Sequence, residues 1–168
     1  MYPPSFLAAT ANVDKNVVDL EDLQYYVTTH QFPSTFKNNK SAKSRLKRKL
    51  DTYLWNDDEK RFYTYVKPLS GSGDVSHLVP VAKDGEEIRK VLYACHYSAG
   101  GHGTHDGVRR MWTDVRTRLF FNDSYNTCSQ VCSSCVSCCQ VKGELVGTSA
   151  PVTAILTRKT NHRVRACN

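Results

Sequence analysis

The stretch that decides the fold runs from His96 to Lys142 and reads HYSAGGHGTHDGVRRMWTDVRTRLFFNDSYNTCSQVCSSCVSCCQVK. Two histidines, His96 and His105, lie in its first part, and Cys135 and Cys138, with the spacing C-x2-C, lie near its end. Imidazole and thiolate ligands together suit the tetrahedral shell of zinc, and four protein ligands leave no open position for a reacting water. The stretch therefore predicts one structural Zn2+ ion that stabilises this segment.

Two alternative ligand choices lie within the same stretch. His102, among glycines three residues before His105, competes with it as the second histidine ligand. Cys132 and Cys135 also have the spacing of a zinc-binding pair. Choosing them would remove Cys132 from a predicted helix face and leave Cys138 without a role. We therefore favour His105, Cys135 and Cys138, and His102 stays open as a substitute for His105.

The residues between the histidine and the cysteine ligands have the periodicity of helices. A helix from about Asp106 to Leu119 is predicted, with His105 at its N-terminal edge. Its apolar face would hold Val108, Met111, Trp112, Val115 and Leu119. Asp123 is expected to cap a second helix. The inward face of that second helix would consist of Tyr125, Cys128, Val131 and Cys132.

This stretch resembles the zinc-binding H2C2 domain of integrases from gypsy-type retrotransposons. The pattern of that family is a His, Gly-His-x-Gly, a basic amphipathic helix, an aromatic pair and C-x2-C-Q-x-x-K. The matching residues are Thr104-His105-Asp106-Gly107, Leu119-Phe120-Phe121, and Cys135, Cys138 and Lys142. Phe121 stands where the family usually has Trp, and Cys139 displaces the Gln by one position. The resemblance implies the same single zinc and the same four ligands.

The region before the stretch predicts a small subdomain of helices and a β-hairpin. Asp19 can cap a short helix through about Thr29, and a basic helix follows from about Ser41 to Thr52. Aromatic segments on both sides of the turn-forming Asn56-Asp57-Asp58 predict the hairpin, Tyr53-Leu54-Trp55 and Phe62-Tyr63-Thr64-Tyr65-Val66. His77-Leu78-Val79-Pro80-Val81 predicts a third strand.

A further helix is predicted to lead into the first histidine ligand. Asp84, with Glu87 three residues later, is typical of a capping box. The residues expected to face inward are Ile88, Val91, Leu92 and Cys95. The order of these elements also resembles the region that precedes the zinc domain in metaviral-type integrases.

The net charge of the chain is concentrated in one short segment. Seven of the 23 Lys and Arg residues lie between Lys37 and Lys49, where no acidic residue occurs, and the other 16 equal the 16 Asp and Glu residues. Clustered cations can release counterions from a nucleic-acid backbone without reading its sequence, although a solvated helix face has the same composition. The residues expected to contact DNA are Lys40, Lys43, Arg45, Lys47, Arg48, Lys49, Arg109, Arg110 and Arg116.

We expect an α+β architecture in four parts. These are an N-terminal tail (1–18), the helix and hairpin subdomain (19–83), the zinc-binding domain (84–142) and a C-terminal linker or tail (143–168). The integrases that this chain resembles catalyse strand transfer with a separate core of three acidic residues. Only 26 residues follow Lys142, and Glu144 is their one acidic residue. The chain is therefore expected not to be an enzyme.

The predicted function is a non-catalytic, retrotransposon-derived module that binds zinc and DNA and takes part in assembly. The alternatives are a zinc-stabilised module for protein interaction or oligomerisation, and an N-terminal fragment of an active integrase. Non-specific DNA binding and possible self-association are expected, with no small-molecule substrate. No stretch has the apolar length of a membrane span, and clustered cysteines fit reduced thiols better than a disulfide framework. An intracellular and nuclear location is therefore expected.

Overall fold

The computed structural model of the chain describes residues 2–67, 76–97, 105 and 107–139. The alternative ligand His102 and the predicted tail after Lys142 lie outside these residues. The helical elements are α1 (Pro4–Ala9), η1 (Val13–Asn16), α2 (Glu21–Thr29), η2 (Ser34–Phe36), α3 (Lys40–Thr52), α4 (Gly85–Tyr97), α5 (Val108–Arg116) and α6 (Ser124–Ser134). The strands are β1 (Tyr53–Asn56), β2 (Arg61–Val66) and β3 (His77–Pro80). The α+β class is confirmed.

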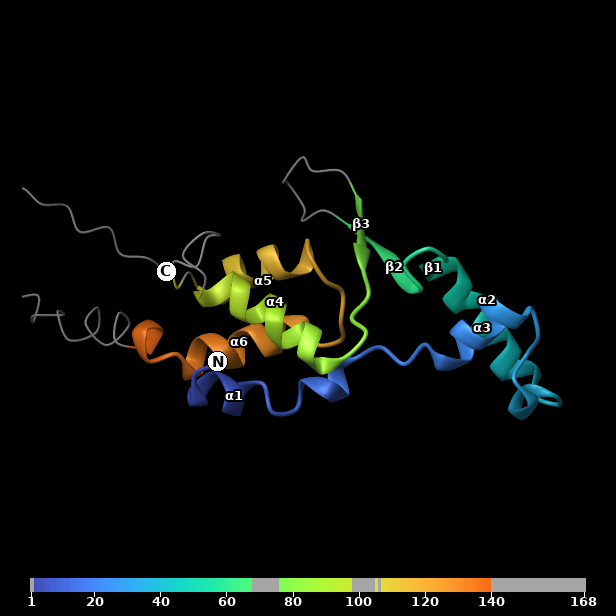
Figure 1. Cartoon of the computed structure of the whole chain (residues 1–168), viewed down its shortest axis with the longest axis horizontal. Helices are drawn as coiled ribbons and strands as arrows, with labels where there is room; N and C mark the ends of the chain where they lie inside the picture. The colour runs from blue at the N-terminus through green and yellow to red at the C-terminus, as the bar shows by residue number, and fades with distance from the viewer. Residues whose placement is uncertain (1, 68–75, 98–104, 106, 140–168) are drawn as a thin grey trace, which may run out of the picture.

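The elements form two groups along the molecule (Figure 1), and the buried side chains form two apolar clusters. Helices α1, α4, α5 and α6 and the short η1 pack around one cluster, and we call this group the zinc module. Helices α2 and α3 lie at the other end of the molecule, where Leu23 and Leu46 pack with Phe62 of the sheet. In the described part of the chain, no helix has the length and apolarity that crossing a membrane requires.

The three strands form an antiparallel sheet in the order β1-β2-β3. The predicted hairpin is present, and the register pairs Trp55 with Phe62 and Tyr53 with Thr64. Because side chains alternate across a strand, these four residues share the face that packs on the helices. The opposite face includes Leu54, Tyr65 and Leu78, which stay 43%, 62% and 45% exposed.

Main-chain hydrogen bonds join the end of the sheet to the zinc module. The amide of Phe120 donates to the carbonyl of Pro80, and the amide of Ala82 donates to the carbonyl of Phe120, both at 2.9 Å. This pairing requires an extended chain at Phe120, so the preceding helix α5 ends at Arg116 and not at Leu119 as the periodicity predicted.

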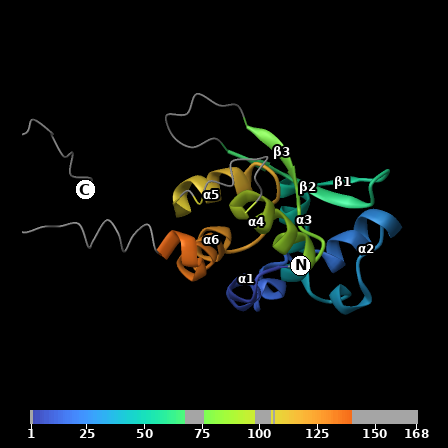
Figure 2. The ribbon, with the colours of Figure 1, turned by 60° about the vertical axis from the view of Figure 1, so that its left-hand side comes forward.

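The prediction of a tail for residues 1–18 differs from the structure. Helix α1 places Phe6 and Thr10 in the zinc module with 0% exposure, and Val13 of η1 is 2% exposed. Asn16 holds the end of this segment to helix α6, because its side-chain amide donates to the hydroxyl of Thr127 at 3.0 Å. The N-terminal segment lies along helices α4 and α6 (Figure 2), and its buried side chains belong to the same apolar cluster as theirs.

Helix α6 begins differently from the expectation. Asp123 is the residue before the helix, but its backbone is left-handed, with φ 55°, and its side chain caps no amide of the helix. Instead its carboxylate accepts a hydrogen bond from the side chain of Asn126 at 2.6 Å. Tyr125, expected inside, is 50% exposed and lies edge-on against Trp112. Cys128 and Cys132 are buried as predicted.

Candidate metal centre

Helix α4 carries the first histidine of the centre into the core of the zinc module. At its start the carboxylate of Asp84 accepts a hydrogen bond from the amide of Glu87 at 2.8 Å, as a capping residue does. Glu87 in turn accepts from the amide of Lys83 at 2.9 Å. The inward face of the helix carries the buried residues Ile88, Leu92 and Cys95. Near the other end of the helix the same face carries His96, which is 1% exposed.

The second histidine lies just before helix α5. His105 has a left-handed backbone with φ 52°, a conformation that non-glycine residues hold only where their surroundings determine it. Its ring lies edge-on to that of His96, with the centroids 4.9 Å apart. The side chain therefore reaches back to the end of α4, although the two histidines are nine positions apart in the sequence.

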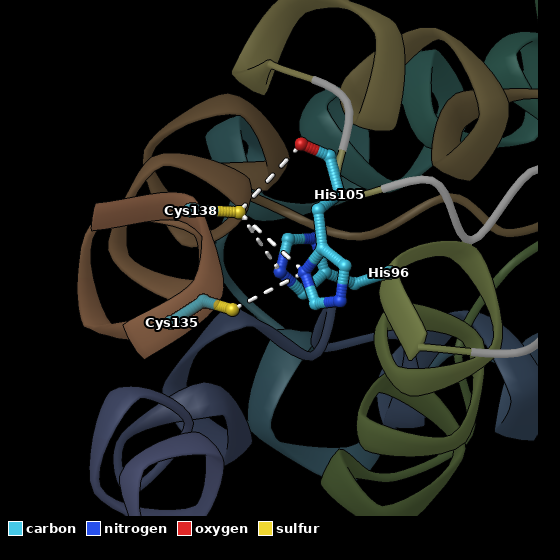
Figure 3. Close-up of side chains that lie close together, drawn as sticks. All are labelled: His96, His105, Cys135 and Cys138. Carbon is cyan, nitrogen blue, oxygen red and sulfur yellow. Dashed lines mark hydrogen bonds between the residues drawn. The ribbon is translucent and has the colours of Figure 1, made fainter. Parts of the chain in front are cut away.

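The two cysteines follow helix α6. Cys135 ends the helix in an extended conformation, and residues 136–139 then form a helical turn in which the amide of Cys139 donates to the carbonyl of Cys135 at 3.0 Å. This reversal turns the side chains of Cys135 and Cys138 toward the same point (Figure 3). Both side chains are buried, whereas Cys139 is exposed.

Four of the predicted residues meet as a cluster. One ligand atom from each of His96, His105, Cys135 and Cys138 lies within 4.8 Å of the others. The sulfur of Cys135 is 3.3 Å from His105 Nδ1, and the sulfur of Cys138 is 3.6 Å from the same atom and 3.5 Å from His96 Nε2. Zinc–nitrogen and zinc–sulfur bonds of ordinary length at a tetrahedral angle separate N and S by about 3.5 Å. The donor set therefore fits one zinc ion.

Burial sets the protonation state of His96, the more deeply buried histidine of this cluster. The pKa of His96 is lowered to about 4, first because burial disfavours the charged ring and second because His105 lies beside it. A neutral imidazole has a free lone pair for a metal, so His96 is held in the form that can bind one.

Tyr97 closes the side of the cluster that faces the N-terminal helix. Its ring lies edge-on to His96 at 4.7 Å and to His105 at 5.7 Å between centroids, and its hydroxyl lies beside the thiol of Cys135. Burial and the two thiols of Cys135 and Cys138 raise the pKa of this hydroxyl, so it stays a donor. Nothing in the sequence pattern indicated this residue.

The other cysteines have different surroundings. The sulfur of Cys132 lies 4.0 Å from His96 Nδ1, on the side of the ring that points away from Cys138. Cys128, one helical turn earlier, has its pKa raised to about 12, mainly by burial. Neither thiol belongs to the four-residue cluster among the described residues, so the structure brings together Cys135 and Cys138 and not the alternative pair with Cys132.

The residues predicted to contact DNA do not all lie together. The basic residues of α3 line one helix, whereas Arg109, Arg110 and Arg116 belong to α5 in the zinc module. Arg116 is engaged within the protein, because its guanidinium covers the ring of Trp112 at 4.8 Å and donates to the carbonyl of Lys67.

Comparison with known proteins identifies the segment that contains the cluster. Residues 83–144 match the integrase zinc binding domain family, and this range includes all four residues of the cluster. The predicted resemblance to the integrase H2C2 domain is confirmed for this segment, and so is zinc as the cofactor of the matched domain. Comparisons with curated proteins and with solved structures gave no significant match.

Proposed function

We propose that this chain is a non-catalytic module, derived from a retrotransposon integrase, that is folded around one zinc and binds DNA without sequence preference through helix α3. The match of residues 83–144 to the integrase zinc binding domain supports zinc binding and the origin from an integrase. When bound, the zinc contributes folding free energy to the module. His96, His105, Cys135 and Cys138 would hold it, and a set of four protein ligands leaves no position for a substrate.

The observation that carries the DNA-binding part is the exposed basic side of helix α3. Ala42 and Leu46 pack into the subdomain, and Lys40, Arg45, Lys47 and Arg48 are exposed. Among the described residues, no acidic side chain lies within ion-pair distance of a cation of this helix. Unpaired cations on one side of a rigid helix can each contact a phosphate and release its counterions.

Two cations of the helix have roles inside the protein. The ammonium group of Lys49 donates to the carbonyl of Asp19 at 2.8 Å, which links α3 to the start of α2. The ammonium group of Lys43 donates to the carbonyl of Lys37 at 3.1 Å and lies over the ring of Phe32. A variant that tests DNA binding should therefore leave Lys43 and Lys49 in place.

The test is the salt dependence of binding to duplex DNA, measured by fluorescence anisotropy. Changing Lys40, Lys47 and Arg48 together to Gln should weaken binding and flatten the plot of log affinity against log salt, by about 0.9 for each phosphate that the variant no longer neutralises. The matched control changes three exposed lysines elsewhere, Lys15, Lys60 and Lys90, to Gln. Both variants have the same reduction in charge, so equal effects on DNA affinity would contradict a site on α3.

A protein-interaction module is the alternative, and the open face of the sheet favours it. Leu54, Tyr65 and Leu78 lie on this face and are 43% to 62% exposed, in a small sheet whose described helices pack on the other side. Changing Tyr65 and Leu78 to Ser would break a complex that uses this face and would leave DNA binding unchanged. If the α3 variant binds DNA like the wild type while this sheet variant loses self-association, the alternative replaces our proposal.

A further inference from the structure

His96 places its two ring nitrogens beside two different thiols. Its Nε2 lies 3.5 Å from the sulfur of Cys138, and its Nδ1 lies 4.0 Å from the sulfur of Cys132. Cys138 belongs to the metal cluster and Cys132 does not. Cys132 is therefore a thiol that touches a metal-binding histidine without being a ligand itself.

The geometry distinguishes the ligand nitrogen from the other nitrogen. A nitrogen and a sulfur bound to the same tetrahedral zinc lie about 3.5 Å apart. The pair His96 Nε2 and Cys138 meets this value, and Nδ1 points to a sulfur outside the cluster. His96 would therefore bind through Nε2, in contrast to His105, whose Nδ1 faces both cysteines of the cluster.

A histidine that binds metal through Nε2 keeps its hydrogen on Nδ1, and this N–H requires an acceptor. His96 is 1% exposed, so the acceptor has to come from inside the module. A carboxylate, a carbonyl or a water is the usual partner in metal sites. At Nδ1 of His96 the structure has the sulfur of Cys132.

The hydrogen of the Cys132 thiol also has an acceptor. Its sulfur lies 3.6 Å from the thioether of Met111, to which the thiol donates. Cys132 can therefore remain a neutral thiol that donates to Met111 and accepts from His96. The three residues come from α6, α5 and α4, so one hydrogen-bonded series links these three helices of the zinc module to the ring of a ligand.

We propose that Cys132 is a positioning residue of the zinc site, which accepts the Nδ1 hydrogen of His96 and holds that ring with Nε2 toward the metal. The proposal deepens the zinc-binding part of the proposed function and is independent of DNA binding. Outer partners of this kind change metal affinity by about 10- to 100-fold when they are removed.

The experiment compares two buried cysteines of the same helix. Cys132→Val removes the acceptor and keeps an apolar side chain of similar size, and Cys128→Val makes the same change at a residue with 0% exposure that is not beside His96. Zinc dissociation constants are measured by competition with a chromophoric chelator. The constant of Cys132→Val should rise about tenfold, whereas that of Cys128→Val should stay near the wild-type value.

A second measurement on the wild-type protein covers the case in which Cys132→Val does not fold. Long-range nitrogen–proton correlation spectra of the zinc-loaded protein should show His96 protonated on Nδ1. Protonation on Nε2 would overturn the proposal, as would equal zinc affinities of the two variants. A wild-type chain that takes up no zinc would instead overturn the four-ligand site itself, together with the role of Cys132.

Discussion

The ring of Phe6 lies edge-on against the ring of Tyr97, with the centroids 5.7 Å apart. Tyr97 in turn lies edge-on against His96 at 4.7 Å, so two aromatic contacts join the N-terminal helix to a metal ligand. Phe6 lies outside the segment that matches the integrase zinc binding domain, yet it is 0% exposed. Helix α1 is therefore a structural part of the zinc module.

Replacing Phe6 with Ala should destabilise the zinc module strongly. Removing a fully buried phenylalanine costs about 3–5 kcal/mol, because the substitution removes apolar contacts and leaves a cavity. The control is Leu7→Ala at the adjacent position, where the side chain is 46% exposed. Urea unfolding followed by circular dichroism should show a large decrease in stability for the first variant and a small one for the second. Similar midpoints for both variants would mean that α1 is only loosely attached.

Replacing Tyr97 with Phe should weaken zinc binding while the aromatic packing is kept. The change removes the hydroxyl beside Cys135 and retains the ring between Phe6 and the histidines. Loss of an outer polar partner of a metal ligand raises the dissociation constant of zinc by about tenfold. Tyr93→Phe is the control, because Tyr93 stacks on Tyr97 one turn earlier in the same helix. An unchanged zinc affinity of Tyr97→Phe would refute a role for this hydroxyl.

Replacing Cys138 with Ser should abolish stoichiometric zinc binding. A serine hydroxyl does not deprotonate to replace a thiolate, so one of four ligands would be missing. Cys139→Ser makes the same substitution at the next residue, which is exposed and outside the cluster. Metal analysis after gel filtration should find one zinc per chain in the control and in the wild type. Equal zinc contents in both variants would show that Cys138 is not a ligand.

The stability of the module should decrease as the pH falls below about 6.5. The pKa of His96 is lowered to about 4 in the folded protein, mainly by burial, from an ordinary value of 6.5. Between these values the unfolded chain binds more protons than the folded one, so the free energy of unfolding is largest above the higher value and falls toward the lower one. Urea midpoints measured from about pH 7 to about pH 5 test this, because most carboxylates stay ionised over that range. A midpoint that rises on acidification would contradict the prediction.

Sequence reasoning predicted the parts of this protein that depend on local spacing. Three of these signals act within a few residues. They are the helical period of Met111 and Val115, the turn at Asn56-Asp57-Asp58, and the C-x2-C spacing of Cys135 and Cys138. Residue type and the resemblance to the H2C2 domain predicted the full set of four ligands, and the structure brings these residues together.

Several features depend on contacts between segments far apart in the chain. Helix α5 ends early because Phe120 pairs with strand β3, and residues 1–18 are not a tail because the open side of the zinc module accepts Phe6 and Val13. Tyr125 is half exposed and packs on the edge of Trp112 of another helix, although the helical period placed it on the inward face. None of these outcomes follows from the sequence near the residue concerned.

The sequence by itself therefore determined the chemistry of the metal centre, imidazole and thiolate donors, because residue type sets ligand chemistry and the C-x2-C spacing sets which cysteines can share one turn. Only the tertiary structure decided what surrounds those donors. Tyr97 and Cys132 lie beside the ligands because helices α1, α4, α5 and α6 pack around one core, and packing follows from the shapes of all the buried side chains together.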